Sequence, residues 1–169
     1  MPKLELTHEI ECSLDAFWSG FFDPALNAKL FLEGLGFRDY KTVSQKETDD
    51  KIVRTTAVEP TLSLPPALSK LLGSSFRYSE EGTFDKATKV WRWKLVPSAM
   101  ADKIRVEGVL RATELGPEKV RRDIELQIEA KVFMVGGLIE ETFQKQLSQG
   151  WTKGADIQNQ WLRAQRAAT

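Results

Sequence analysis

The chain has 169 residues, of which 41% are hydrophobic and 28% charged, and its 24 lysines and arginines balance its 24 aspartates and glutamates. This length suits one domain over residues 1–169, and the zero net charge provides no long-range field to attract nucleic acid, so we expect no nucleic-acid partner. The N-terminus lacks the apolar run of a signal peptide, and no segment approaches the roughly 20 apolar residues of a membrane span, which predicts a cytoplasmic protein with no integral membrane segment.

The first predicted elements are a strand and two short helices. In residues 3–12 apolar positions alternate with polar ones, which is typical of a strand with one covered face. Ser13 can cap a helix whose aromatic residues fall on one stripe. Asp23 and Pro24 end that helix and start a second one, which stops at Gly34-Leu35-Gly36.

Residues 37–132 have the period of strands. Breaks at residues 49–50, 60–73, 85–86, 97–102 and 116–117 divide them into six runs. Together with the first run they predict seven strands, and the mostly short connections favour an antiparallel meander with one wet and one covered face.

The covering element should be a helix over residues 138–167. Its apolar residues lie near one stripe, and at about 1.5 Å per residue it is long enough to cross a small sheet. A curved sheet closed by one long helix encloses space between them, so this architecture itself predicts a binding cavity.

The order of one strand, two short helices, six strands and one long helix resembles the α+β helix-grip fold of the START and birch-pollen-allergen superfamily, also called SRPBCC. Within it, the chain resembles a bacterial family, the domain of unknown function numbered 2505. The closer likeness rests on these segments: Leu64-Pro65-Pro66 with Lys70-Leu71-Leu72-Gly73, Val132-Phe133-Met134-Val135-Gly136-Gly137-Leu138-Ile139-Glu140, and Trp161-Leu162.

The resemblance implies a cavity between sheet and long helix that binds an apolar or amphipathic small molecule, such as a lipid, an isoprenoid or a polyketide-like ring. It supplies no catalytic signature, and we expect neither a metal nor a cofactor. Fold alone does not establish function, and the sequence identifies no protein partner.

Two polar residues fall on apolar strand faces. His8 is the only histidine, which argues against a histidine-rich metal site. It is either a hydrogen-bonded core residue or a polar anchor for a ligand. Arg122 lies near the start of the last strand, where it is either a structural side chain that reaches solvent or a clamp for a carboxylate at the cavity mouth.

Aromatic and acidic residues of the central strands are further candidates. The alternation places Glu80 on the face of Tyr78, but a shift of one residue would expose it, and Glu81 beside it leaves both registers open. If Glu80 points inward, desolvation favours its neutral form. Trp91 and Trp93 share one strand face and suit both a core and a cavity wall.

The connection over residues 62–73 is too apolar for a simple loop. Pro66 can begin a short helix that presents Leu68, Leu71 and Leu72 on one side. In the related plant hormone receptors the equivalent connection resembles a gate over the pocket, while a static cap at the barrel end is the alternative.

Gly150 and Gly154 lie within the predicted long helix and share a face. Each lowers helix propensity by about 1 kcal/mol relative to alanine. Either the helix breaks there, or the missing side chains make room for close packing or for a ligand.

Three functions are compatible with these features. The first is binding of a small molecule without transforming it. The second is an enzyme resembling polyketide cyclases, in which His8 with Glu80 or Tyr78 supplies acid and base. The third is an interaction module resembling the chaperone activators of the superfamily, which predicts a small, filled interior.

Overall fold

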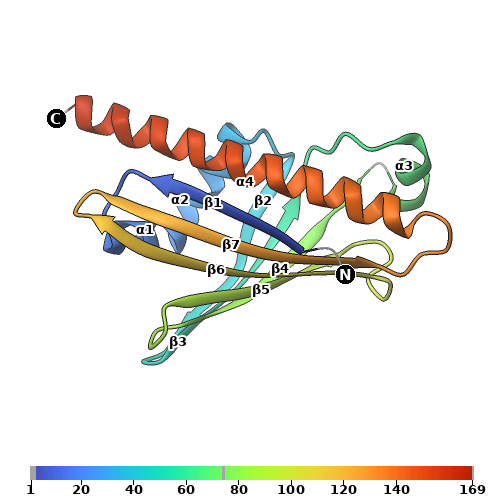
Figure 1. The fold of residues 1–169 in the computed structure, drawn as a ribbon, viewed down its shortest axis with the longest axis horizontal. Coiled ribbons are helices and arrows are strands. Elements are labelled where there is room, and N and C mark those ends of the chain that lie inside the picture. The colour runs from blue at the N-terminus through green and yellow to red at the C-terminus, as the bar shows by residue number, and fades with distance from the viewer. Residues whose placement is uncertain (1–2, 74, 169) are drawn as a thin grey trace.

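The computed structural model describes residues 3–73 and 75–168, which form a curved antiparallel sheet crossed by one long helix (Figure 1). The sheet has seven strands in the order β1-β7-β6-β5-β4-β3-β2. Their bounds are β1 Lys3–Ile10, β2 Asp39–Glu47, β3 Lys51–Glu59, β4 Tyr78–Asp85, β5 Val90–Pro97, β6 Ile104–Gly116 and β7 Lys119–Ala130. Strands β2 to β7 form a meander, and β1 adds to the free edge of β7, so the two edge strands are β1 and β2.

Local capping explains where the first helices begin. The Ser13 hydroxyl accepts a hydrogen bond from the Ala16 backbone N–H at 3.1 Å and starts α1 (Leu14–Phe21). The Asp23 carboxylate does the same for α2 (Pro24–Lys29), in which Pro24 occupies the first turn. Helix α2 continues into a π-helical turn, η1 (Leu30–Gly34). The expected pair of tandem helices is therefore present.

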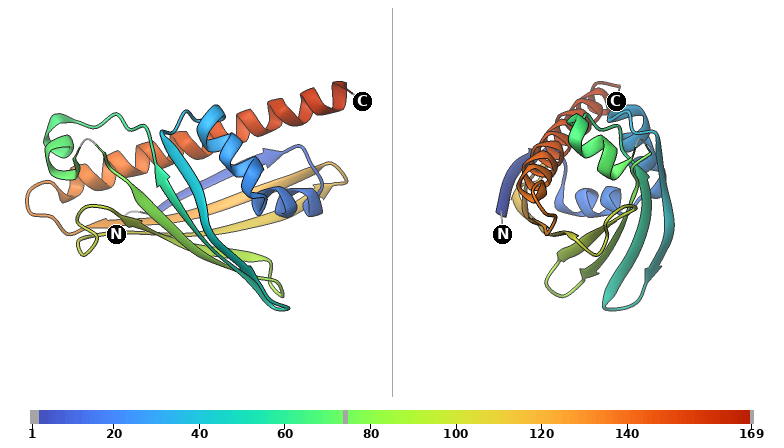
Figure 2. Two further views of the ribbon diagram at one scale, coloured as in Figure 1. Left: turned by 180° about the vertical axis from the view of Figure 1, so that it is seen from behind. Right: turned by 90° about the vertical axis from the view of Figure 1, so that its right-hand side faces the viewer.

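The long helix α4 (Gly136–Ala167) lies along β1 and β7 (Figure 1). The end-on view of Figure 2 shows the sheet curling around an interior that α4 and the short helix α3 (Pro66–Leu72) cover. Ile139 and Phe143 bury their side chains beneath α4, as the predicted apolar stripe requires. The helix is continuous through Gly150 and Gly154, so the possibility of a break there is wrong.

The structure has the α+β architecture that the sequence predicts, with strand breaks close to the expected positions. Helix α3 begins at Pro66 as expected. Its three leucines do not share one environment, however, because Leu68 and Leu72 are buried in the core while Leu71 is partly exposed. The three positions are i, i+3 and i+4 of one helix face, and Leu71 lies at the edge of that face, where solvent reaches it.

Candidate functional site

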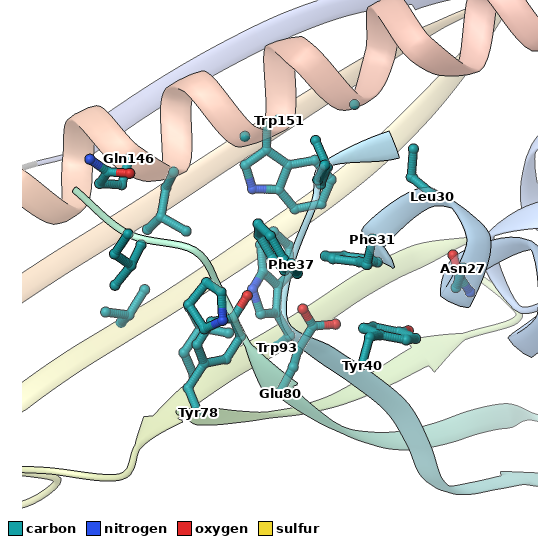
Figure 3. Close-up of a pocket in the computed structure, with 18 of the residues that line it drawn as sticks. Asn27, Leu30, Phe31, Phe37, Tyr40, Tyr78, Glu80, Trp93, Gln146 and Trp151 are labelled. Carbon is teal, nitrogen blue, oxygen red and sulfur yellow. The ribbon is translucent and has the colours of Figure 1, made fainter. Parts of the chain in front are cut away.

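A partly enclosed cavity of about 150 Å³ lies between the concave face of the sheet and α4. Its walls come from α1, α2, η1, strands β2 to β7, α4 and the loops at residues 35–37 and 60–62. Figure 3 shows Trp151 reaching down from α4, while Tyr40, Tyr78, Glu80 and Trp93 rise from the sheet toward the same space. Most of the lining is aromatic or aliphatic, with a few polar groups among it, which is the composition of small-molecule sites.

The two tryptophans form the aromatic part of the wall. The ring centroids of Trp93 on β5 and Trp151 on α4 lie 5.7 Å apart and are inclined at 51°. This sheet-to-helix contact bounds the cavity on one side, because both residues also belong to its lining. The rings offer flat apolar surfaces against which a ligand ring can pack.

A buried ion pair supplies one group of polar atoms. The Arg54 Nη2 donates to the Glu80 Oε1 at 3.2 Å, and the exposed fractions of the two side chains are 5% and 16%. Arg54 also donates to the Phe21 carbonyl oxygen at 2.6 Å, and its guanidinium carbon lies 4.8 Å from the Trp91 ring centroid. Desolvation raises the pKa of Glu80, although the Arg54 charge and hydrogen bond oppose this shift.

Two phenols adjoin this pair. Burial raises the pKa of Tyr40 to about 12 and raises the pKa of Tyr78 further, with the Glu80 carboxylate adding to both shifts. Both phenols therefore keep their protons at neutral pH and can act as hydrogen-bond donors to a ligand.

Arg122 is the second buried cation of the lining, with only 4% of its surface exposed. Its Nη2 donates to the Trp151 carbonyl oxygen and to the His8 Nδ1, each at 3.0 Å, and its guanidinium carbon lies 4.9 Å from the Trp151 ring centroid. Its Nε has no hydrogen-bond partner among the described residues. Burial lowers the pKa of Arg122 to about 10, so it remains charged at neutral pH.

His8 stands directly opposite Arg122 in the β1–β7 register. Because its Nδ1 accepts from Arg122, the neutral ring must carry its proton on Nε2, which is 3.1 Å from the Thr152 Oγ1 on α4. Burial and then the Arg122 charge lower the pKa of His8, while Asp156 opposes them. His8 thus connects β1, β7 and α4 as a neutral residue.

The roof of the cavity includes two positions without side chains. Gly150 and Gly154 of α4 both line it, and a Cβ atom added at either would find no atom within 4 Å. A continuous helix leaves two explanations for the glycines, close backbone packing and room for a ligand. The open space beside both positions favours room for a ligand.

Six of the nine sequence-predicted site residues line the cavity: Tyr78, Glu80, Trp93, Arg122, Gly150 and Gly154. The structure decides the register of β4, since Glu80 faces inward and Glu81 outward. Arg122 also differs from the expected mouth position, because it is buried and held by two neutral acceptors.

His8, Leu68 and Trp91 do not line the cavity. His8 lies behind Arg122, and Leu68 is fully buried in the core beneath α3. Trp91 is 1% exposed because its ring packs among the phenylalanines of α1 and its C-terminal cap. Since His8 is outside the lining, the predicted pairing of His8 with Glu80 or Tyr78 is not completed within the cavity.

Arg54 and Trp151 are the main lining residues that the sequence did not single out. In β3 apolar residues occupy both parities, with Ile52 and Val58 on one face and Val53 on the other, so alternation gives no clear direction for Arg54. Trp151 directly follows Gly150, and a large aromatic residue beside a helix glycine was the only signal in the sequence that could have placed Trp151 at the cavity.

Among residues 3–73 and 75–168, no group of three or more metal-ligating side chains is present. Within the same residues, no helix combines the length and the apolar character needed to cross a membrane.

A seven-stranded antiparallel sheet crossed by one long C-terminal helix is the helix-grip fold, and a START superfamily protein of known structure shares it. The sequence matches the family described as a protein of unknown function, DUF2505, over residues 5–162, and the chain belongs to this family. Both the fold and the family that the sequence predicted are thereby confirmed. No curated protein matches the sequence.

Solved structures with the same fold include three informative ones. An aromatase/cyclase from Streptomyces sp. R1128 has a TM-score of 0.65 and 12% identity, covering 99% of this chain and 96% of its own. A START superfamily protein from Mycobacterium smegmatis has a TM-score of 0.61 and 14% identity, covering 95% and 98%. Norcoclaurine synthase from Thalictrum flavum, solved with dopamine and hydroxybenzaldehyde, has a TM-score of 0.60 and 13% identity, covering 92% and 85%. At these identities the likeness concerns the fold.

Proposed function

We propose that this protein binds an apolar or amphipathic small molecule in the cavity beneath α4 without transforming it. The observation that carries the proposal is the cavity of about 150 Å³ whose wall is mainly aromatic and aliphatic and includes two glycines of α4. An apolar cavity of roughly this size holds one benzene ring. The ligand therefore places a ring-sized group inside, and any longer portion extends through the open side.

An interaction module predicts a filled interior, and the cavity speaks against that alternative. The enzyme alternative draws support from Glu80, whose carboxyl faces the cavity beside Tyr78 and whose pKa is raised, and from the cyclase and the synthase among the proteins of similar fold. Against it, Arg54 holds the Glu80 carboxylate and His8 does not reach the lining, so a free acid–base pair is not assembled.

The test is a titration with the apolar fluorescent probe N-phenyl-1-naphthylamine, followed by competition with fatty acids, sterols, flavonoids and single-ring compounds. We expect one saturable probe site and a rise in melting temperature with the competing ligand, because a ligand that binds only the folded state stabilises it. Absence of both signals would overturn the binding proposal. Native mass spectrometry of protein purified from its own host then identifies a retained molecule.

Incubating each bound competitor with the protein and examining it by mass spectrometry separates binding from catalysis. An unchanged ligand supports the proposal. Turnover that is lost in Glu80→Gln and kept in Glu81→Gln favours the enzyme, since Glu81 faces away from the cavity on the same strand.

A further inference from the structure

We propose that the cavity selects a small carboxylic acid, with its carboxylate bound by Arg122 and its ring packed against Trp93 and Trp151. This inference rests on the proposed binding function and specifies the ligand class. It follows from the charge balance inside the cavity, from the donors that Arg122 leaves free, and from the size of the enclosed space.

The two buried cations of the lining differ in their partners. Arg54 is paired with the Glu80 carboxylate at 3.2 Å, so that the pair adds no net charge. Arg122 has no carboxylate within ion-pairing distance among the described residues, and the two groups that accept from it are a backbone carbonyl and a neutral imidazole. A buried charge without a counterion is costly, so a site that retains one is suited to an anionic ligand.

The geometry leaves Arg122 able to donate. Both hydrogen bonds of Arg122 use Nη2, and within residues 3–73 and 75–168 Nε and Nη1 make none. Nε is covered by neighbouring atoms, so Nη1 is the donor that this lining residue can offer to the cavity. Its side chain is also fixed, because the Trp151 ring and carbonyl lie against it and His8 stands opposite. A carboxylate placed there meets an ordered cation in a site shielded from water, where charge-assisted hydrogen bonds are strong.

The two tryptophans of the cavity wall determine which group the carboxylic acid carries. Trp151 contacts both Arg122 and Trp93, so an anion bound at the guanidinium continues naturally into the space beside the two indoles. The volume of about 150 Å³ accommodates a single ring. A short acid bearing one aromatic or alicyclic ring satisfies both parts, whereas an amine would face the Arg122 charge.

The test compares 3-phenylpropanoate with 3-phenylpropanamide, which differ in charge but hardly in shape, by isothermal titration calorimetry on the intact protein. We expect the acid to bind on the order of tenfold more tightly than the amide, and acetate to bind far more weakly than either because it lacks the ring. The variant Arg122→Gln should abolish the preference for the acid. Arg121→Gln should keep it, because Arg121 is the adjacent residue of β7 on the outer face, paired with Asp123.

Retained amide binding by Arg122→Gln verifies that the variant still forms the cavity, and if the variant does not fold, the acid–amide comparison on the unmodified protein decides alone. Equal affinities for acid and amide, a preference that survives Arg122→Gln, or acetate binding as tightly as the ring acid would each overturn the inference. If N-phenyl-1-naphthylamine saturates the site but the acid does not displace it, only the carboxylate inference fails. If neither the probe nor the acid nor the amide binds, the proposed function fails with it.

Discussion

The indole ring of Trp93 lies over Gly108 of the neighbouring strand β6, where a Cβ atom would come within 2.4 Å of the ring carbon Cζ2. A similar contact occurs on the other side of β5, where a Cβ at Gly82 of β4 would lie 2.2 Å from Cζ2 of Trp91. Each glycine thus gives an indole room to lie flat on the sheet. Because Trp93 also lines the cavity, Gly108 sets the position of a cavity wall without being part of it.

Gly108→Ala should therefore lower the free energy of unfolding by about 1–3 kcal/mol, since a rigid ring must move to admit the methyl group. It should also weaken binding of N-phenyl-1-naphthylamine. Gly116→Ala on the same strand is the control, because an added Cβ there meets no atom within 4 Å. Chemical denaturation and probe titration measure both effects, and equal stability of the two variants would contradict the overlap.

The sequence predicted the fold well because strand alternation, capping residues and chain breaks are local signals. The alternation of residues along a strand also predicted which side chains point to the covered face of the sheet, and it placed Trp93 and Arg122 there. This alternation does not say what covers each part of that face. Trp91, two residues before Trp93, meets α1 and becomes core, whereas Trp93 meets the cavity. That difference depends on where α1 and α4 lie over the sheet, which no short stretch of sequence specifies.

Glycine at position 150 provides the second prediction. A Cβ there points into open space, so Gly150→Ala should raise stability by about 1 kcal/mol through helix propensity and leave probe binding unchanged. Gly150→Leu should fill the cavity and abolish probe binding. Lys153→Leu on the exposed surface of α4 controls for added apolar volume. Thermal unfolding and titration are the measurements, and a destabilised alanine variant or a leucine variant that binds normally would remove this helix face from the site.

The third prediction asks whether the segment Leu64–Gly73 is a mobile gate over the cavity or a static cap at the end of the barrel. The loop before α3 is tied to α4 by the Gln146 side chain, whose Nε2 donates to the Ser63 carbonyl oxygen at 3.2 Å, and α3 itself buries Leu68 and Leu72 in the core. We predict that it opens more readily than the sheet unfolds, because few interactions hold so short a helix. Hydrogen exchange should show low protection that increases when ligand binds. Exchange as slow as that of β6 and β7, with or without ligand, would identify a static cap.

Glu80 should make stability depend on pH. Its pKa in the folded protein is raised above the ordinary 4.5, mainly by desolvation. A carboxyl shifted in this direction contributes its full stabilisation below the ordinary pKa, and the contribution is lost as pH rises through the folded value. Denaturation at several pH values from 4 upward should show the unmodified protein losing stability relative to Glu80→Gln. The difference should be absent for Glu81→Gln, and parallel curves for all three proteins would refute the assignment.

His8 reports directly on the charge of Arg122, and it is the only histidine, so one set of imidazole resonances can be followed by NMR. Its pKa lies below the ordinary 6.5 because of burial and then the Arg122 charge, against the opposing charge of Asp156 on α4. Arg122→Gln should therefore raise the pKa of His8, while Arg121→Gln should leave it unchanged. Bound 3-phenylpropanoate should also raise it by neutralising the guanidinium, and bound 3-phenylpropanamide should not. If acid and amide bind yet shift the His8 pKa equally, the carboxylate does not lie at Arg122.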